Sequence, residues 1–171
     1  MKKLVIITHP NIEDSIVNKT WQSKLEENTD TFVVYSLYEQ YPNLDFNIKR
    51  EQQLLESYNE IIFQFPIHWY STPYALKKYI DVVFEYGWAF GPEGNKLSGK
   101  KIGFAVSTGG PEESYNSPTG ISIKNLLNDF YLTFEYCGCQ LLETHVFYGA
   151  MFNYKNEAIL ENSKIYMESF A

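Results

Sequence analysis

The feature of this sequence that most restricts its fold is the alternation of strand-like apolar runs with segments of helical periodicity. The runs over residues 4–8, 60–65 and 101–107 are dominated by β-branched and aromatic residues, as is typical of strands buried on both faces. Further strands are expected over residues 31–37 and 140–147. Because helices separate successive strands, we expect a parallel sheet with helices on both faces. Right-handed crossovers then favour the strand order 2-1-3-4-5.

Start and stop signals locate the helices that connect these strands. Ser15 is a capping residue at the start of the first helix, and Thr72-Pro73 supplies a capping hydroxyl followed by proline at the first position of a later one. Gly87 is expected to end that later helix. The predicted helices cover residues 15–25, 48–57, 72–86, 121–137 and 156–170. Since no repeat or Pro/Gly-rich linker interrupts the chain, residues 1–171 are expected to form a single domain.

The charge balance and the cysteine content exclude several classes of protein. The chain has 14 Lys and Arg against 21 Asp and Glu, a net charge of −7, whereas a protein that neutralises nucleic-acid phosphates has the opposite balance. Its two cysteines, Cys137 and Cys139, are too few for a disulfide scaffold. No apolar run approaches the roughly 18 residues of a membrane span. We therefore expect a cytoplasmic protein that does not bind nucleic acid.

In a sheet with this strand order, ligands bind beyond the carboxyl ends of the strands, near the point where the order reverses. That rule selects the loops after the first, third and fourth strands, which are residues 9–18, 65–73 and 107–115. In the first loop, the N–H groups and dipole of a helix start could hold a phosphate, with the Ser15 hydroxyl and His9 as further donors. Glu13 and Asp14 oppose an anion, so an alternative stays open in which Ser15 only caps the helix and His9 is a surface turn residue.

The other two loops have features suited to a flat ligand, each with a structural alternative. Trp69 and Tyr70 directly follow a buried strand, where they could form a wall against a planar ring or pack beneath the following helix. Gly109 and Gly110 let the backbone approach a ligand closely, and their N–H groups could donate to carbonyl or ring-nitrogen acceptors. Alternatively, together with Pro111, they form a plain turn.

Several motifs that would indicate other chemistry match only in part. Residues 94–100 fit most of a phosphate-binding P-loop, but Lys101 replaces the Ser or Thr that holds magnesium, and the segment precedes a strand instead of following one. A single residue separates Cys137 from Cys139, which is not the redox spacing. The three histidines lack metal-ligand spacing: His9, His68 and His145. The sequence therefore predicts no metal site and no nucleotide hydrolysis.

Taken in order, the residues of these loops resemble those of a known family. The matching positions are His9-Pro10, Ser15, Asn18, the block over residues 65–73 and the run over residues 107–110, with further segments at residues 37–48 and 84–91. This combination is similar to that of the flavodoxin-like NAD(P)H:quinone oxidoreductases, in particular the small bacterial branch that includes the ancillary flavoprotein of glutathione-gated potassium efflux systems and the general-stress NAD(P)H oxidoreductases. The resemblance spans nearly the whole chain and implies an α/β flavodoxin-like three-layer sandwich around a five-stranded parallel sheet.

The resemblance implies that FMN, in preference to FAD, binds non-covalently, with NAD(P)H as the electron donor. All three loops would contribute to the cofactor site. The phosphate and ribityl chain would be held by His9, Ser15 and Asn18 with the backbone of Ile16 and Val17. The ring would be held by Ile67, His68, Trp69 and Tyr70, and its polar edge by Thr108, Gly109 and Gly110, with Pro66 and Ser107 beside them as further cofactor-binding residues.

One candidate catalytic residue follows from the same resemblance. Tyr115 stands about where the larger mammalian quinone reductases have a tyrosine that assists hydride transfer. Those enzymes also use a histidine, but Gly120 and Ile121 occupy the matching region, so no catalytic histidine is expected. A second departure is His68, at a place where the family often has glutamine.

The resemblance also implies a mechanism and partners. Hydride would pass from NAD(P)H through FMN to a quinone-like acceptor in a ping-pong cycle within one pocket. Family members are typically homodimers, with the loop around Trp88 and Phe90 near the interface. A potassium efflux membrane protein is a further expected partner, which would bring the chain to the inner face of the membrane. Two alternatives stay open, namely a regulatory flavoprotein subunit of such a system with little turnover and a flavodoxin-type electron carrier.

Overall fold

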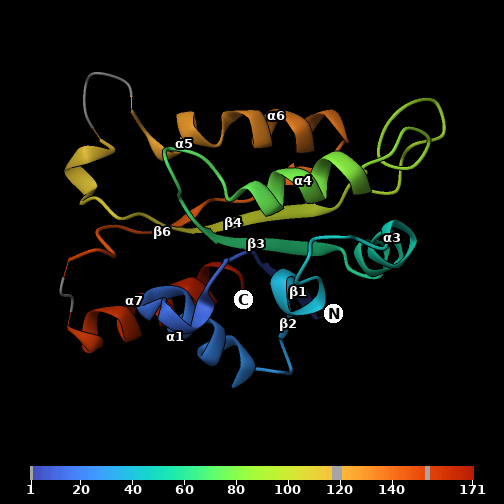
Figure 1. The fold of residues 1–171 in the computed structure, drawn as a ribbon. Helices are drawn as coiled ribbons and strands as arrows, with labels where there is room; N and C mark the ends of the chain where they lie inside the picture. Colours follow the sequence, from blue (N-terminus) through green and yellow to red (C-terminus); the bar gives the residue numbers. More distant parts are fainter. Residues whose placement is uncertain (1, 117–120, 153–154) are drawn as a thin grey trace.

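The computed structural model describes residues 2–116, 121–152 and 155–171 and alternates strands with helices along the chain (Figure 1). The strands are β1 (Lys3–Ile7), β2 (Phe32–Ser36), β3 (Glu60–Pro66), β4 (Lys101–Ser107), β5 (Gln140–Leu141) and β6 (His145–Phe147). The α-helices are α1 (Ile16–Glu26), α2 (Leu37–Gln40), α3 (Ile48–Glu56), α4 (Tyr74–Val83), α5 (Ile123–Leu126), α6 (Asn128–Tyr136) and α7 (Asn156–Ser169). Two short 3₁₀ helices, η1 (Ile12–Asp14) and η2 (Glu112–Ser114), lie in the first and third predicted loops.

The strands pair in parallel in the order β2-β1-β3-β4-β5, which confirms the predicted topology. The prediction of one unbroken strand over residues 140–147 is wrong, because β5 and β6 are separate strands that both pair with β4. From Ile102 to Ala105 the β4 strand advances three residues, while its partner advances four, from Leu141 to His145. One extra residue on the edge side is a β-bulge, and it interrupts the ladder.

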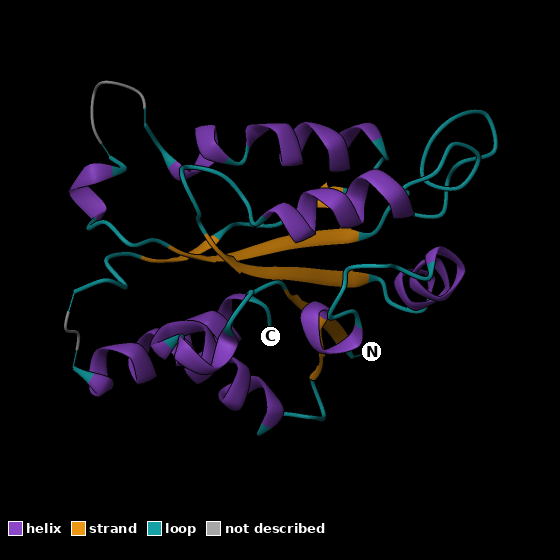
Figure 2. Ribbon diagram, viewed as in Figure 1, coloured by secondary structure: helices purple, strands orange, loops and turns teal. Residues whose placement is uncertain are grey.

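Helices cover both faces of the sheet, with α4, α5 and α6 on one side and α1 and α7 on the other (Figure 2). Successive residues of β1 alternate between the two cores, as the period of a strand requires. Leu4 and Ile6 pack in the cluster that contains α4 and α6, and Val5 and Ile7 pack in the cluster that contains α1 and α7. The buried central strands thereby fix the carboxyl ends of β1, β3 and β4 side by side.

Three helix boundaries differ from the sequence prediction. α4 begins at Tyr74 with Pro73 at the N-cap position, and Thr72 makes no capping hydrogen bond. The same helix ends at Val83, before the predicted Tyr86, and Gly87 lies in the following turn with a φ of 79°. The helix predicted over residues 121–137 is divided at Leu127, whose backbone angles of −105° and 8° leave the helical region.

Two buried contacts connect the helices to the sheet. Gly103 in the middle of β4 lies against the buried ring of Phe170, so a Cβ at residue 103 would overlap Cε1 of that ring and lie 3.0 Å from its Cζ. On the other face, the fully buried carboxylate of Glu51 in α3 accepts hydrogen bonds from the hydroxyl groups of Tyr35 and Tyr41, each at 2.6 Å, and Tyr79 at 3.1 Å. Because a buried carboxylate needs such donors, this group ties α3 to β2 and α4.

Within the part of the chain that the structure describes, none of the helices has the length and hydrophobicity that crossing a lipid bilayer requires.

Candidate functional site

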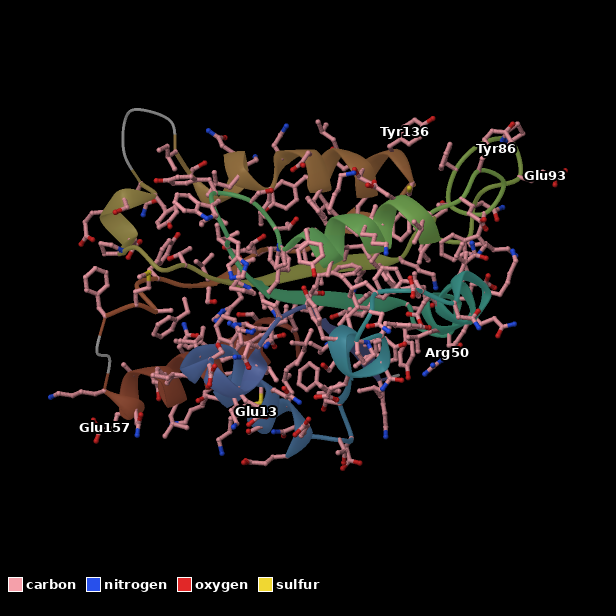
Figure 3. All side chains as sticks on the ribbon, viewed as in Figure 1. Glu13, Arg50, Tyr86, Glu93, Tyr136 and Glu157 are labelled. Carbon is pink, nitrogen blue, oxygen red and sulfur yellow. The ribbon has the colours of Figure 1, made fainter. Side chains whose placement is uncertain are left out.

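The three predicted loops meet at one cavity beyond the carboxyl ends of β1, β3 and β4. Its volume is about 290 Å³, and residues 14–17, 66–68, 107–109 and 150–151 line it. Larger hollows exist, including one of about 770 Å³ between α4 and α6. Position, not size, distinguishes the cavity at the strand ends, since this is where α/β sheets bind ligands. In Figure 3, Glu13 is labelled just before α1, and Tyr86 and Glu93 are labelled in the loop at the other end of the sheet.

The start of α1 presents hydrogen-bond donors to this cavity. The Ser15 Oγ accepts a hydrogen bond from the Asn18 N–H at 3.2 Å, so the hydroxyl proton stays available to another acceptor. Within the described residues, the N–H groups of Ile16 and Val17 have no partner, as expected in the first turn of a helix. Together with the helix dipole they make an anion-binding end of the cavity. The Asp14 side chain, which also lines it, accepts a hydrogen bond from Asn11.

Asn18 connects two of the loops instead of facing the cavity. Its side chain is buried, and its Nδ2 donates to the Ser107 Oγ at 2.9 Å. Gln64, on β3, donates from Nε2 to the backbone oxygen of Asn18 at 3.1 Å. The side chain predicted to bind a phosphate therefore positions Ser15 and Ser107, and its polar atoms are directed at protein groups.

His9 lies beside the cavity as a neutral hydrogen-bond donor. Its Nδ1 accepts a hydrogen bond from the Asn11 N–H at 3.2 Å, which assigns the ring proton to Nε2. Its ring is 6.5 Å from that of His68, which lines the cavity. Burial, followed by the nearby His68, lowers the pKa of His9 from its ordinary value of 6.5. The imidazole is therefore uncharged at neutral pH, and its Nε2–H donates to no atom of the described residues.

The loop after β3 is a tight and strained turn. His68 and Ser71 exchange two backbone hydrogen bonds, of 2.8 Å and 3.0 Å, around Trp69 and Tyr70. Both central residues have positive φ, 47° and 62°, which is the geometry of a type I′ turn. Large aromatic residues rarely adopt this conformation, and such strain is concentrated at functional sites.

The two aromatic side chains of this turn project into solvent. Trp69 is 95% exposed and Tyr70 is 58% exposed, so the alternative that they pack beneath the following helix is wrong. Neither ring lines the cavity, which is bounded on this side by Pro66, Ile67 and His68. The backbone N–H groups of Trp69 and Tyr70 have no partner among the described residues. The turn therefore holds two unpaired N–H groups and two exposed rings directly after His68, which lines the cavity.

The glycine loop after β4 supplies another pair of donors. Thr108 is fully buried, and its hydroxyl donates to the Gly110 oxygen at 2.9 Å and accepts from the Gly149 N–H at 3.4 Å. With the loop held in this way, the N–H groups of Gly109 and Gly110 have no partner in the described chain. A Cβ at Gly109 would lie 2.7 Å from the Met151 sulfur, so a side chain at that position would displace Met151.

Ala150 and Met151 belong to the cavity although the sequence analysis did not select them. They follow β6, and the Ala150 N–H donates to the Thr108 oxygen at 2.7 Å. Met151 is 86% exposed and covers Gly109. The strand-end rule, applied to the last strand as well, would have found this fourth loop.

Tyr115, the predicted catalytic residue, lies next to the glycine loop and does not line the cavity. It is buried, and its ring is 5.8 Å from that of Tyr148. A Cβ at Gly110 would be 3.5 Å from the Tyr115 hydroxyl oxygen, so this hydroxyl lies next to Gly110. Burial, and then the charge of Glu112, raise the pKa of Tyr148. Gly120 belongs to the region in which the larger mammalian enzymes have their histidine, and it lies outside the described residues.

No group of three or more His, Cys, Asp or Glu side chains in the described ranges could hold a metal ion. Two buried polar atoms, Thr8 Oγ1 and Gln64 Oε1, have no hydrogen-bond partner among the described residues.

Comparison with known proteins places the chain among flavin-related oxidoreductases. The family described as having the flavodoxin-like fold matches residues 1–170. General stress protein 14 of Bacillus subtilis (strain 168) is 46% identical over 151 residues, which cover 87% of this chain and 86% of that protein. An uncharacterized NAD(P)H oxidoreductase, YrkL, of the same organism is 42% identical, covering 88% and 87%. The glutathione-regulated potassium-efflux system ancillary protein KefF of Enterobacter sp. (strain 638) is 37% identical, covering 81% and 78%.

Solved structures agree in fold over the full chain. General stress protein 14 of Treponema denticola, solved in complex with FMN, superposes with a TM-score of 0.92 at 35% identity and covers 98% of this chain and 97% of its own. An NADPH-quinone reductase of P. pentosaceus superposes with a TM-score of 0.88 at 25% identity, covering 100% and 98%.

Proposed function

This chain belongs to the family with the flavodoxin-like fold, and from that membership we propose that residues 1–171 act as one FMN-binding unit that oxidises NAD(P)H and reduces a quinone. The observation that carries the proposal is that residues of all three loops line one cavity at the strand ends, where the N–H groups of Ile16, Val17 and Gly109, from the first and third loops, have no partner among the described residues. FMN, NAD(P)H and quinone are proposed because the names of the similar proteins mention them.

The residues at one end of the cavity fit the phosphate of FMN. The N–H groups of Ile16 and Val17 and the hydroxyl of Ser15 are free donors at a helix start, where an anion is stabilised. His9 adds an uncharged N–H donor beside them. Asn18 acts behind this end by holding Ser15 in place.

The residues at the other end fit a planar ring with a polar edge. Pro66, Ile67 and His68 form an apolar and aromatic boundary, and the exposed Trp69 directly follows His68 in the chain. The free N–H groups of Gly109 and Gly110 suit carbonyl and ring-nitrogen acceptors. We propose that these residues contact the FMN ring and that Tyr70, Ser107 and Thr108 support them in doing so.

FMN, when bound, supplies the transfer of a hydride equivalent between NAD(P)H and the acceptor. The protein's part is to orient the donor and acceptor and to stabilise charge. Negative charge that develops at the polar edge of the ring would be stabilised by the N–H groups of Gly109 and Gly110, which are already positioned by Thr108. Because the three loops line one and the same cavity, donor and acceptor would occupy it in turn, which gives ping-pong kinetics.

Tyr115 is proposed to assist from behind the glycine loop. Its hydroxyl lies close to Gly110 and could donate to a group at the polar edge of the ring. Removal of one such donor costs at most about 3–4 kcal/mol of transition-state stabilisation. We expect Tyr115→Phe to slow single-turnover reduction within that limit, while the control Tyr58→Phe, just before β3 at the other end of the sheet, leaves it unchanged. An unchanged rate in Tyr115→Phe would remove this residue from the mechanism.

The central experiment is reconstitution of the purified protein with FMN, followed by gel filtration and an absorbance spectrum. We expect a retained yellow chromophore that is bleached by NADPH or NADH without oxygen and restored by a quinone. Free FMN with the same reagents is the control. Loss of the chromophore on gel filtration would overturn the cofactor assignment, and a retained but unreactive chromophore would overturn the reductase.

A regulatory flavoprotein is the second candidate, favoured by the similarity to the potassium-efflux ancillary protein. In that case the chain would act at the inner face of the membrane by docking on an efflux protein, with little turnover. Tight binding to such a partner together with negligible quinone reduction would support it. A flavodoxin-type carrier is the third, and preference for one-electron over two-electron acceptors would favour it.

We further propose a cytoplasmic homodimer. Apolar and aromatic residues form most of the lining of the hollow of about 770 Å³ between α4 and α6, together with Asp81, Thr133 and Glu135, and two of the lining residues, Leu132 and Tyr136, are exposed. Apolar area of this kind on a soluble domain is typical of an interface. Light scattering of the purified protein measures the mass, and a monomer at micromolar concentration would contradict this part of the proposal.

A further inference from the structure

A second polar hollow lies at the opposite end of the sheet, where the strands begin. Its volume is about 620 Å³, and its walls come from the loop before β4 and from the starts of β4 and β5. Figure 1 shows this loop, in yellow-green, at the far end of the sheet from the start of α1. Three lysines line the hollow together with three neutral polar residues: Lys96, Lys100, Lys101, Asn59, Ser98 and Gln140.

The three lysines bring positive charge to this hollow, and the Glu56 carboxylate offsets part of the charge of Lys100. Across the described ranges, none of them forms an ion pair with a carboxylate. Lys100 is buried, and its ammonium group donates to the backbone oxygens of Glu56 at 3.1 Å and Tyr58 at 2.6 Å, which fixes its charge in the wall. The acid that also lines the hollow, Glu60, has the Lys3 ammonium 3.3 Å away. The local charge is therefore positive in a chain whose net charge is −7.

The neutral groups of the hollow are available to a ligand. The side chains of Asn59, Ser98 and Gln140 make no hydrogen bond to another described residue, and all three can donate. Ammonium groups that share a hollow repel one another, and a bound anion with several acceptor oxygens relieves that repulsion. Phosphate oxygens suit this combination of lysine, hydroxyl and amide donors.

We propose that this hollow binds a small anion that contains a diphosphate group. The segment is the one that partly matches a P-loop in sequence, but its location before β4 gives it no role in nucleotide hydrolysis. The hollow and the cavity at the strand ends lie at opposite ends of the sheet, so its ligand would not compete with FMN. The proposal does not depend on the function of that other cavity.

The test uses inorganic pyrophosphate and ADP, titrated at constant ionic strength into the full-length protein with FMN in excess. Calorimetry gives the affinity, and ¹⁵N–¹H spectra locate the site. We expect saturable binding with amide shifts centred on residues 96–101. The Lys96→Ala/Lys101→Ala double variant should bind about tenfold or more weakly, while a control double variant, Lys77→Ala/Lys164→Ala, removes lysines paired elsewhere and should bind as the wild type does.

The two probes also distinguish the source of the diphosphate. Tighter binding of ADP would assign a nucleoside diphosphate, and equal binding would assign the diphosphate group alone; either result supports the site. Absence of saturable binding at millimolar pyrophosphate would overturn the proposal. So would equal affinity in the Lys96→Ala/Lys101→Ala variant, or amide shifts centred on residues 15–17.

Discussion

The strained turn between β3 and α4 yields a quantitative prediction. Trp69 and Tyr70 both hold positive φ, and a left-handed conformation costs a non-glycine residue roughly 1–2 kcal/mol. Asn-Gly is the pair best suited to a type I′ turn, so Trp69→Asn/Tyr70→Gly should relieve about 2–4 kcal/mol of strain. Glycine returns about 0.5–1 kcal/mol of that through its greater entropy in the unfolded chain. Because both side chains are largely exposed, little burial is lost.

The expected net gain in the free energy of unfolding is therefore about 1–3 kcal/mol. In a protein of this size each kcal/mol raises the Tm by roughly 2–4 °C, so the FMN-free variant should melt at least about 2 °C above the wild type in calorimetry. The same variant should retain FMN less well, because we propose that the Trp69 ring contacts the cofactor.

Trp69→Ala is the matched control, since it removes the indole and leaves a non-glycine residue at positive φ. It should lose FMN affinity sharply without a rise in Tm. If Trp69→Asn/Tyr70→Gly does not raise the Tm, the turn is not strained and the reasoning fails. If FMN binds Trp69→Ala as tightly as the wild type, the indole does not contact the cofactor.

Three further predictions concern stability. Gly103→Ala places a Cβ into the buried ring of Phe170 and should destabilise the protein by about 1–3 kcal/mol, as measured by urea unfolding. The same substitution in a Phe170→Leu background should cost less. Equal losses in both backgrounds would show that the Phe170 ring is not the obstacle. Tyr79→Phe removes a hydrogen bond to the buried Glu51 carboxylate and should lower the free energy of unfolding by about 1.5–3 kcal/mol. A variant as stable as the wild type would contradict this hydrogen bond. Burial lowers the pKa of His145 below 6.5, so this residue binds more protons in the unfolded chain than in the folded one below that pH. The contribution of His145 to stability should fall by up to about 1.4 kcal/mol per pH unit as the pH drops from 6.5 towards the folded pKa, and His9, whose pKa is also lowered, adds a loss of the same sign. The measurement is therefore the difference between wild type and His145→Gln, and identical pH profiles would exclude His145 as a cause.

The strand order and the location of the site follow from the sequence because they depend on periodicity and on the rule for strand ends. Buried runs such as residues 60–65 and capping residues such as Ser15 act locally, so their effect can be predicted without tertiary structure. The meeting of Ser15, His68 and Gly109 at one cavity follows from the topology alone.

The differences from the prediction arise where distant contacts determine the local structure. The bulge in the last strand depends on the register with β4, which a single strand's sequence does not encode. Asn18 was expected to face a ligand, yet Ser107, 89 residues away, takes its side-chain amide. Trp69 and Tyr70 have aromatic side chains that favour extended backbone, and only the closure between His68 and Ser71 holds them at positive φ.

The interruption between β5 and β6 also affects how the molecule behaves at high concentration. These two strands form one border of the sheet, and a long, regular border would offer its free N–H and C=O groups to the same border of another molecule. Here the exposed ladder consists of pieces of two and three residues, offset by the bulge. Intermolecular strand pairing along this border would therefore lose register after a few residues, which protects the protein from assembling into extended β-structure.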